Sequence, residues 1–308
     1  MLTHKHSKLN TREVLVDLEE NHKLSLSNEY LKATSDYVGS IAQSKEEIWS
    51  YDNPVEDKDV HAVAIGIDGA MMYLIEEDKK GYREAMTGTI ALYNKEGVRL
   101  HTNYIASTPE YGKENFYKQM EHEIKKVKKT YPQAKYIGIA DGAACNWPFL
   151  EKHTAVQITD FFHATEYLKE AALAIFEAEK EKNEWLDNRC HAMKHDKCSV
   201  VNLINEMTTF LKENNYSKEK QVQLNKTITY FTNQSPRMDY YSYIQDGYPI
   251  GSGVTEAACK KIIKHRFCQS GMKWKEKGSA AILSLRCLES SGRWTQFWGK
   301  INKYGIAA

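Results

Sequence analysis

The stretch from residue 61 to residue 75 constrains the fold more than any other part of the chain. It reads HAVAIGIDGAMMYLI, an apolar run of strand type with one carboxylate, Asp68, in its middle. An ionised Asp inside a buried strand is costly unless a cation or a hydrogen-bonding partner compensates its charge. Asp68 is therefore either a satisfied structural acid or the first ligand of a cation site.

Side chains alternate between the two faces of a strand, so the face that carries Asp68 also carries small residues. These are Ala62, Ala64 and Gly66. Small side chains leave room for a helix or a ligand to approach this face closely.

The order of the apolar runs predicts an α/β domain. Runs at residues 61–75, 82–93 and 98–106 are separated by short polar turns, which is typical of an antiparallel meander. A long amphipathic helix over 113–131 and strands at 135–141 and 155–160 follow. Three antiparallel strands followed by βαβ units is the order of a ribonuclease H-like mixed sheet.

The remaining segments are predicted to be helical. Residues 161–243 read mostly as helix, which predicts a helical insertion at about 165–245 within a domain spanning 56–308. Residues 1–55 read as a short, poorly buried helical appendage, one of whose helices should end at Gly39. This appendage is either structural or a truncated DNA-binding region.

Charge is unevenly distributed along the 308 residues. The net charge is +1. The segment from Ser252 onward contains eleven Lys and Arg but only three Glu, so its net charge is +8 and that of the rest of the chain is −7. A basic C-terminal segment indicates contact with a polyanion, although a solvated basic helix face is an equally simple interpretation. No apolar run is long enough to cross a membrane, and the six scattered Cys indicate reduced thiols, so we expect a cytoplasmic protein without membrane contact.

Two further acids lie at positions where ligand-binding and catalytic sites are often found. Asp141 follows the fourth predicted strand, at the edge where open α/β sheets place ligands, although an Asp-Gly pair is also a common turn. Glu256 lies near the start of a late helix, between a buried stripe and a basic stripe, where it could equally serve as a helix-capping acid. Three such carboxylates could bind Mg²⁺, and two Mg²⁺ ions can promote phosphodiester displacement.

Four blocks of the sequence resemble insertion-sequence transposases of the Kra type. The longest is GYPIGSGVTEAACKKIIKHRFCQSGMKWKEKGSAAILSLR at residues 247–286. The others are REAMTGTI at 83–90, DGAACNW at 141–147 and DFFHA at 160–164. The resemblance runs from about residue 60 to the C-terminus.

This resemblance implies a DDE transposase with a ribonuclease H-like fold, related to Mutator-like transposases. It implies Asp68, Asp141 and Glu256 as catalytic residues that bind Mg²⁺ or Mn²⁺. Asp160 and His163 look like the (C/D)xxH motif of Mutator-like enzymes and would have a supporting role. The implied partners are transposon-end and target DNA, bound by a homodimer or higher oligomer at the bacterial nucleoid.

The basic segment supplies candidate DNA contacts. These are Lys260, Lys264, Arg266, Lys273, Lys275 and Lys277, of which the last three surround Trp274 in a segment expected to be an exposed loop.

Other interpretations remain open. Full-length members of the family carry a longer N-terminal region that recognises transposon ends, so the chain could be a truncated, non-catalytic DNA-binding remnant. A ribonuclease H-like nuclease would cleave without strand transfer. Zinc binding by Cys190, His191, His195 and Cys198 is disfavoured, because their spacing fits no common structural zinc site.

Overall fold

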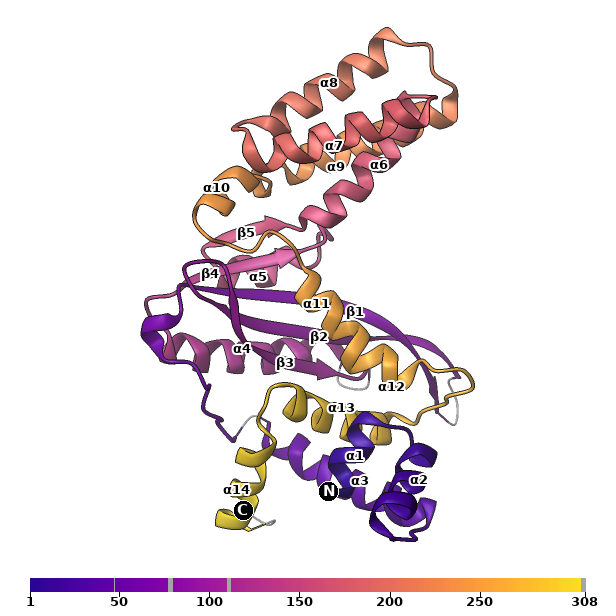
Figure 1. Ribbon diagram of the computed structural model, residues 1–308, viewed down its shortest axis with the longest axis vertical. Helices are drawn as coiled ribbons and strands as arrows, with labels where there is room; N and C mark the ends of the chain where they lie inside the picture. Colours follow the sequence, from indigo (N-terminus) through magenta and orange to yellow (C-terminus); the bar gives the residue numbers. More distant parts are fainter. Residues whose placement is uncertain (47, 77–79, 110–111, 306–308) are drawn as a thin grey trace.

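The computed structural model describes residues 1–46, 48–76, 80–109 and 112–305. Its long axis carries three parts in succession: a bundle of helices at one end, a sheet with its covering helices in the middle, and a second group of helices at the other end (Figure 1). Both termini lie in this second group.

The described residues form one five-stranded mixed sheet in the order β3-β2-β1-β4-β5. The first three strands are antiparallel neighbours, and β4 and β5 run parallel to β1. The predicted meander and the two later strands are therefore confirmed, as is the mixed α/β class. The strands are β1 (Ala62–Ile75), β2 (Lys80–Tyr93), β3 (Arg99–Ser107), β4 (Lys135–Ala140) and β5 (Val156–Thr159).

One face of the sheet is covered by the predicted amphipathic helix, α4 (Gly112–Thr130), and by the short helix α5 (Trp147–His153). The β1 side chains that point to this face are Val63, Ile65 and Ile67, and they share a buried core with the apolar stripe of α4. The larger apolar residues of β1 therefore lie on the face opposite Asp68, as the alternation predicts.

The other face is covered by one continuous helical stretch. It consists of α11 (Gly253–Ala258), the π-helical segment η4 (Cys259–Lys264) and α12 (His265–Phe267). This stretch crosses β1 and β2 in Figure 1 and contacts both strands. π-Helical turns are rare and occur frequently at functional sites.

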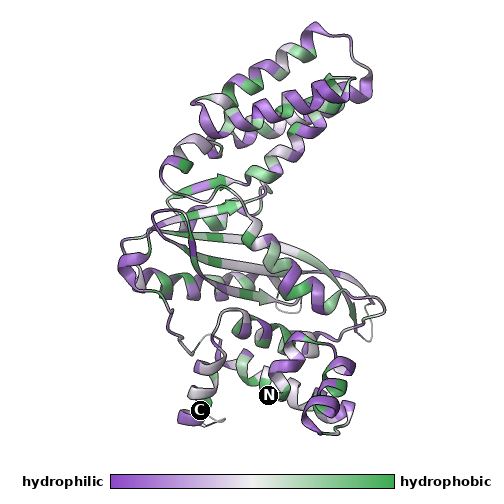
Figure 2. Ribbon diagram, viewed as in Figure 1, coloured by the Kyte–Doolittle hydropathy of each residue, from purple (hydrophilic) through white to green (hydrophobic). Residues whose placement is uncertain are grey.

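The predicted insertion is helical. Its helices are α6 (Phe161–Ile175), α7 (Glu179–His195), α8 (Ser199–Glu213) and α9 (Lys218–Gln234), followed by η3 (Ser235–Arg237) and α10 (Tyr240–Gln245). Hydrophilic and hydrophobic residues alternate along the bundle helices (Figure 2), as expected of amphipathic helices packed around their own core. Leu168, Met207 and Phe231 lie in that core and are fully buried.

The N-terminal helices do form, but they are better buried than predicted. They are α1 (Leu2–Lys8), α2 (Thr11–His22) and α3 (Asn28–Lys45). Of these, α1 and α3 pack against α13 (Glu276–Ser290), whereas α2 packs against α1 and α3. Val14 and Leu18 are fully buried, and Ile41 shares a core with residues of α13. The expectation of a poorly buried appendage is wrong because distant C-terminal helices complete its core.

Gly39 does not end α3, as was predicted, but lies inside it. A Cβ atom at Gly39 would stand 2.5 Å from the carbonyl oxygen of Ala281. Glycine is therefore needed here so that α3 can approach α13 closely. The last helix, α14 (Trp294–Tyr304), packs beside α13, and none of the described helices is long and apolar enough to span a membrane.

Candidate active site

Asp68 and Asp141 belong to neighbouring parallel strands. Pairing of β1 with β4 runs from Ala62 opposite Lys135 to Gly66 opposite Ile139. Continuing this register by two residues brings Asp68 level with Asp141, which directly follows β4. Adjacent strands lie about 4.8 Å apart. The two acids that the sequence singled out separately therefore occupy one level of the sheet.

Each of these carboxylates accepts one local backbone hydrogen bond. The amide of Gly69 donates to Oδ1 of Asp68 at 2.7 Å, and the amide of Ala143 donates to Oδ1 of Asp141 at 2.9 Å. Asp141 thus also makes the turn that its Asp-Gly sequence predicts. Both side chains are half-buried, so they remain within reach of solvent and ligands.

Glu256 is carried on the face of the sheet to which Asp68 points. The preceding residue, Thr255, packs directly on Gly66, and its hydroxyl lies 2.7 Å from that of Thr89 on β2. Gly66 and Asp68 are two residues apart and share one face of β1. The small residue at position 66 therefore determines how closely α11 approaches the sheet.

Ser252 joins Glu256 to Asp160. Its hydroxyl lies 3.0 Å from Oε1 of Glu256 and also hydrogen-bonds Oδ2 of Asp160. Asp160 is fully buried at the start of α6, where its Oδ1 accepts a hydrogen bond from the amide of Phe162 at 2.7 Å. A serine hydroxyl carries a single proton, so it can donate to only one of the two carboxylates at a time. The sequence pattern gave no sign of this bridge.

The four acids form two pairs. Asp68 and Asp141 are level on adjacent strands, whereas Asp160 and Glu256 are linked through Ser252. Over the described residues, no group of three or more His, Cys, Asp or Glu side chains is gathered closely enough to hold a metal ion. The oxygen-only donor set is nevertheless of the kind that Mg²⁺ prefers.

Comparison with protein-family models and with curated proteins finds no match for this chain. The geometry of these residues is therefore the basis on which a function can be proposed.

A buried thiol lies beside Asp68. Cys259 follows Glu256 by three residues and begins the π-helical segment. Burial raises its pKa to about 12, and the charge and hydrogen bonding of Asp68 act in the same direction. The thiol therefore stays protonated at neutral pH. Its place on the buried stripe of the helix was visible in the sequence, but its contact with Asp68 was not.

His163 does not join the carboxylates. Its Nδ1 lies 3.4 Å from Oε2 of Glu166, one turn further along α6, and both side chains are substantially exposed. The structure thus separates Asp160, which is buried in the bridge to Ser252, from His163, which lies at the surface.

Five of the six predicted DNA contacts are exposed. Lys260 and Lys264 lie on the outer side of the η4 segment. Lys273 and Lys275 lie along the connection into α13, and Lys277 lies in the first turn of that helix. Arg266 differs from the other five, because only 2% of its surface is exposed. Its guanidinium stacks on Trp274 with its carbon 4.6 Å from the ring centroid, so it lies inside the protein.

The interpretation of Cys190, His191, His195 and Cys198 as side chains that do not bind zinc stays a prediction. His191 and His195 lie on α7 with ring centroids 4.3 Å apart and ring planes tilted by 36°.

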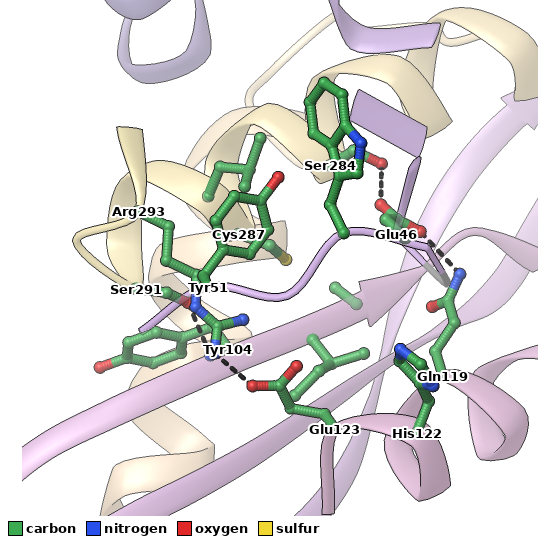
Figure 3. Close-up of a pocket in the computed structure, with 14 residues that line it drawn as sticks. Glu46, Tyr51, Tyr104, Gln119, His122, Glu123, Ser284, Cys287, Ser291 and Arg293 are labelled. Atoms are coloured by element: carbon green, nitrogen blue, oxygen red, sulfur yellow. Dashed lines mark hydrogen bonds and ion pairs between the residues drawn. The ribbon is translucent and has the colours of Figure 1, made fainter. Parts of the chain in front are cut away.

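A separate cavity of about 60 Å³ lies between β3, α4 and α13 (Figure 3). Several of its polar lining groups are paired with one another. Arg293 donates to Glu123, Gln119 donates to Glu46 at 2.8 Å, and Ser284 also donates to Glu46. The lining residues are not among the acids described above, so this cavity is a structural feature that joins the helices to β3.

Proposed function

We propose that the protein is a DNA transposase that cuts transposon ends and joins them to target DNA with the help of Mg²⁺ or Mn²⁺. One observation carries the proposal: Asp68 and Asp141 are level on adjacent parallel strands, with the helix of Glu256 packed on the face that bears Asp68. Carboxylates from two neighbouring strands and a covering helix suit divalent cation binding next to a nucleic acid.

The strand order supports a ribonuclease H-like fold. The chain makes an antiparallel meander first and then adds β4 and β5 in parallel on the other side of β1, giving the order β3-β2-β1-β4-β5. This is the arrangement that the resemblance to Kra-type transposases implies, and it makes β1, with Asp68, the central strand.

The carboxylates fit Mg²⁺ by their oxygen chemistry and by the common level of Asp68 and Asp141, although their side chains are not yet gathered around one point. When bound, the metal would activate the attacking water or 3′-hydroxyl and stabilise the leaving oxygen. We assign Asp68 and Asp141 as two of its ligands. We assign Glu256 as the third, because Asp160 is fully buried whereas Glu256 retains partial access to solvent.

The exposed lysines have a different role in this proposal. Lys260 and Lys264 follow Glu256 on the same helical stretch, and Lys273 to Lys277 continue toward α13. Their ammonium groups would neutralise DNA phosphates next to the carboxylates. We expect the active form to be a homodimer or higher oligomer, because two transposon ends must be held at once.

The test is a cleavage and joining assay on linear DNA that carries the element's ends, with Mg²⁺ or Mn²⁺. Asp68→Asn, Asp141→Asn and Glu256→Gln should each reduce both steps at least a hundredfold. Asp187→Asn is the matched control, since Asp187 is an exposed acid on α7, outside this constellation. Wild-type activity in Asp68→Asn would refute the assignment. Cleavage without joining would instead identify a ribonuclease H-like nuclease.

A non-catalytic DNA-binding protein is the second candidate. It is favoured by the finding that the described carboxylates are not gathered closely enough to hold a metal ion. This function predicts salt-sensitive DNA binding, no cleavage with any divalent metal, and no effect of Glu256→Gln on binding.

A further inference from the structure

A pocket of about 420 Å³ lies between the N-terminal helices and the connection that leads into α13. Its N-terminal wall includes His6, Lys32 and Asp36, and its C-terminal wall includes Arg266, Lys273 and Trp274. The pocket is thus built from segments at opposite ends of the sequence. Its volume is within the usual range for small-molecule sites.

Arg266 is a buried cation that lacks an ion-pair partner in the described part of the chain; the charge of Glu13 acts on it, but not as a direct ion pair. Among the described residues no Asp or Glu forms an ion pair with it, and its Nε has no hydrogen-bond partner. Its nearest polar contact is Nη2 to Nε2 of His6 at 3.3 Å. A buried guanidinium that lacks a compensating charge is costly. The position therefore calls for a negatively charged group.

Arg286 shows how a buried guanidinium is satisfied elsewhere in the fold. It is also buried, but its nitrogens donate to the backbone carbonyl oxygens of Ser7, Lys261 and Ile262. Arg266 has no comparable set of acceptors, and the nearby charge of Arg286 adds to its cost. The two arginines differ in one respect that matters here: Arg266 lines this pocket and Arg286 does not.

The other charges around the pocket are mostly positive. Lys32, Lys273 and Lys275 line it and are exposed, and Asp36 is the one acid among the described lining residues. His6 adds no positive charge at neutral pH, because burial and the neighbouring cations Arg266 and Lys32 lower its pKa to about 4. Asn10 and Thr11, at the start of α2, add polar groups to the same wall.

We propose that this pocket binds a phosphate group, either of a DNA strand or of a free nucleotide. Guanidinium and ammonium groups recognise phosphate by charge-assisted hydrogen bonds. The proposal does not depend on the carboxylates or on any chemical step. It gives the N-terminal helices a function, because Lys32 comes from α3 and Lys273 from the other end of the chain.

The first experiment measures the thermal unfolding midpoint of the full chain in inorganic phosphate and in NaCl of equal ionic strength. Phosphate should raise the midpoint of the wild type more than NaCl does. The apparent affinity should fall about tenfold in Lys32→Gln and in Lys273→Gln, and rise in Asp36→Asn. Lys180→Gln, an exposed residue on α7, should leave it unchanged. Equal phosphate stabilisation in wild type and Lys32→Gln would overturn the proposal.

The second experiment identifies the source of the phosphate. The affinity for a fluorescent DNA duplex is measured over a range of salt concentrations for the wild type and Lys32→Gln. If the pocket binds the DNA backbone, the slope of log K against log salt should change by about one in the variant. Weakened phosphate binding with an unchanged DNA slope would indicate a free nucleotide. If Lys32→Gln changes neither phosphate binding nor the salt dependence of DNA binding, the proposal of a phosphate-binding pocket is contradicted. Both readouts are independent of cleavage.

Discussion

Thr255 lies so close to Gly66 that a Cβ atom at position 66 would stand 2.0 Å from the Thr255 hydroxyl oxygen. This contact connects α11 to the central strand two residues before Asp68. It also explains why β1 carries small residues on the face that bears Asp68, since any larger side chain would lift the helix that carries Glu256.

Gly66→Ala should therefore destabilise the protein by about 2 kcal/mol, because the added methyl group must push Thr255 away from its partner Thr89. It should also reduce the DNA cleavage that we propose, since α11 carries Glu256. Urea unfolding gives the free energy. Gly81→Ala is the control, because a Cβ there meets nothing within 4 Å. The double variant Gly66→Ala/Thr255→Ala should recover part of the loss, and no recovery would contradict this explanation.

The buried ion pair in Figure 3 should be a large contributor to stability. Arg293 and Glu123 have side chains only 9% exposed, and Asn103 also donates to Glu123 at 3.2 Å. Among the described residues, Arg293→Met leaves the buried carboxylate with only Lys126, 4.0 Å away, as a cationic partner. We expect a loss of about 3 kcal/mol in the free energy of unfolding.

The matched control for this pair is Lys180→Met. Lys180 pairs with Glu184 at the surface, with side chains 86% and 62% exposed, so its loss should cost less than about 0.5 kcal/mol. The double variant Arg293→Met/Glu123→Met should be more stable than Arg293→Met alone, because it removes the stranded carboxylate. The reverse order of stability would refute the interpretation.

His6 should make stability depend on pH. Burial, followed by the charges of Arg266 and Lys32, lowers its pKa from 6.5 to about 4, and its Nδ1 lies 2.7 Å from the hydroxyl of Ser35. The unfolded chain therefore binds a proton at a higher pH than the folded protein does. The stability that His6 contributes is complete above pH 6.5 and is lost as the pH falls toward 4, by about 2 kcal/mol between pH 7.5 and pH 5.

Urea unfolding across this pH range checks the prediction. His6→Gln should show a flatter pH dependence than the wild type, whereas the exposed His22→Gln should retain the wild-type dependence. Identical pH dependence in His6→Gln and wild type would exclude His6 as the cause.

The sequence was sufficient for features that depend on local pattern. Alternation in β1 predicted which face Asp68 occupies, and apolar spacing predicted α4. The contacts that it missed join distant segments. His6 and Arg266 meet across 260 residues of sequence, and this contact buries an arginine that local patterning places on a basic surface. Ser252 is another case, because no local pattern in the sequence indicates the two carboxylates that its hydroxyl contacts.

Asp68 and Asp141, level on adjacent strands, are proposed to bind a divalent cation together with Glu256. A crystal structure of the protein soaked with Mn²⁺, with the metal located by its anomalous scattering, tests this most directly. We expect Mn²⁺ to lie between Asp68 and Asp141, with Glu256 released from Ser252 to become the third ligand. Mn²⁺ bound by Asp160 instead of Glu256 would overturn the third ligand, and no Mn²⁺ at Asp68 would contradict the claim itself.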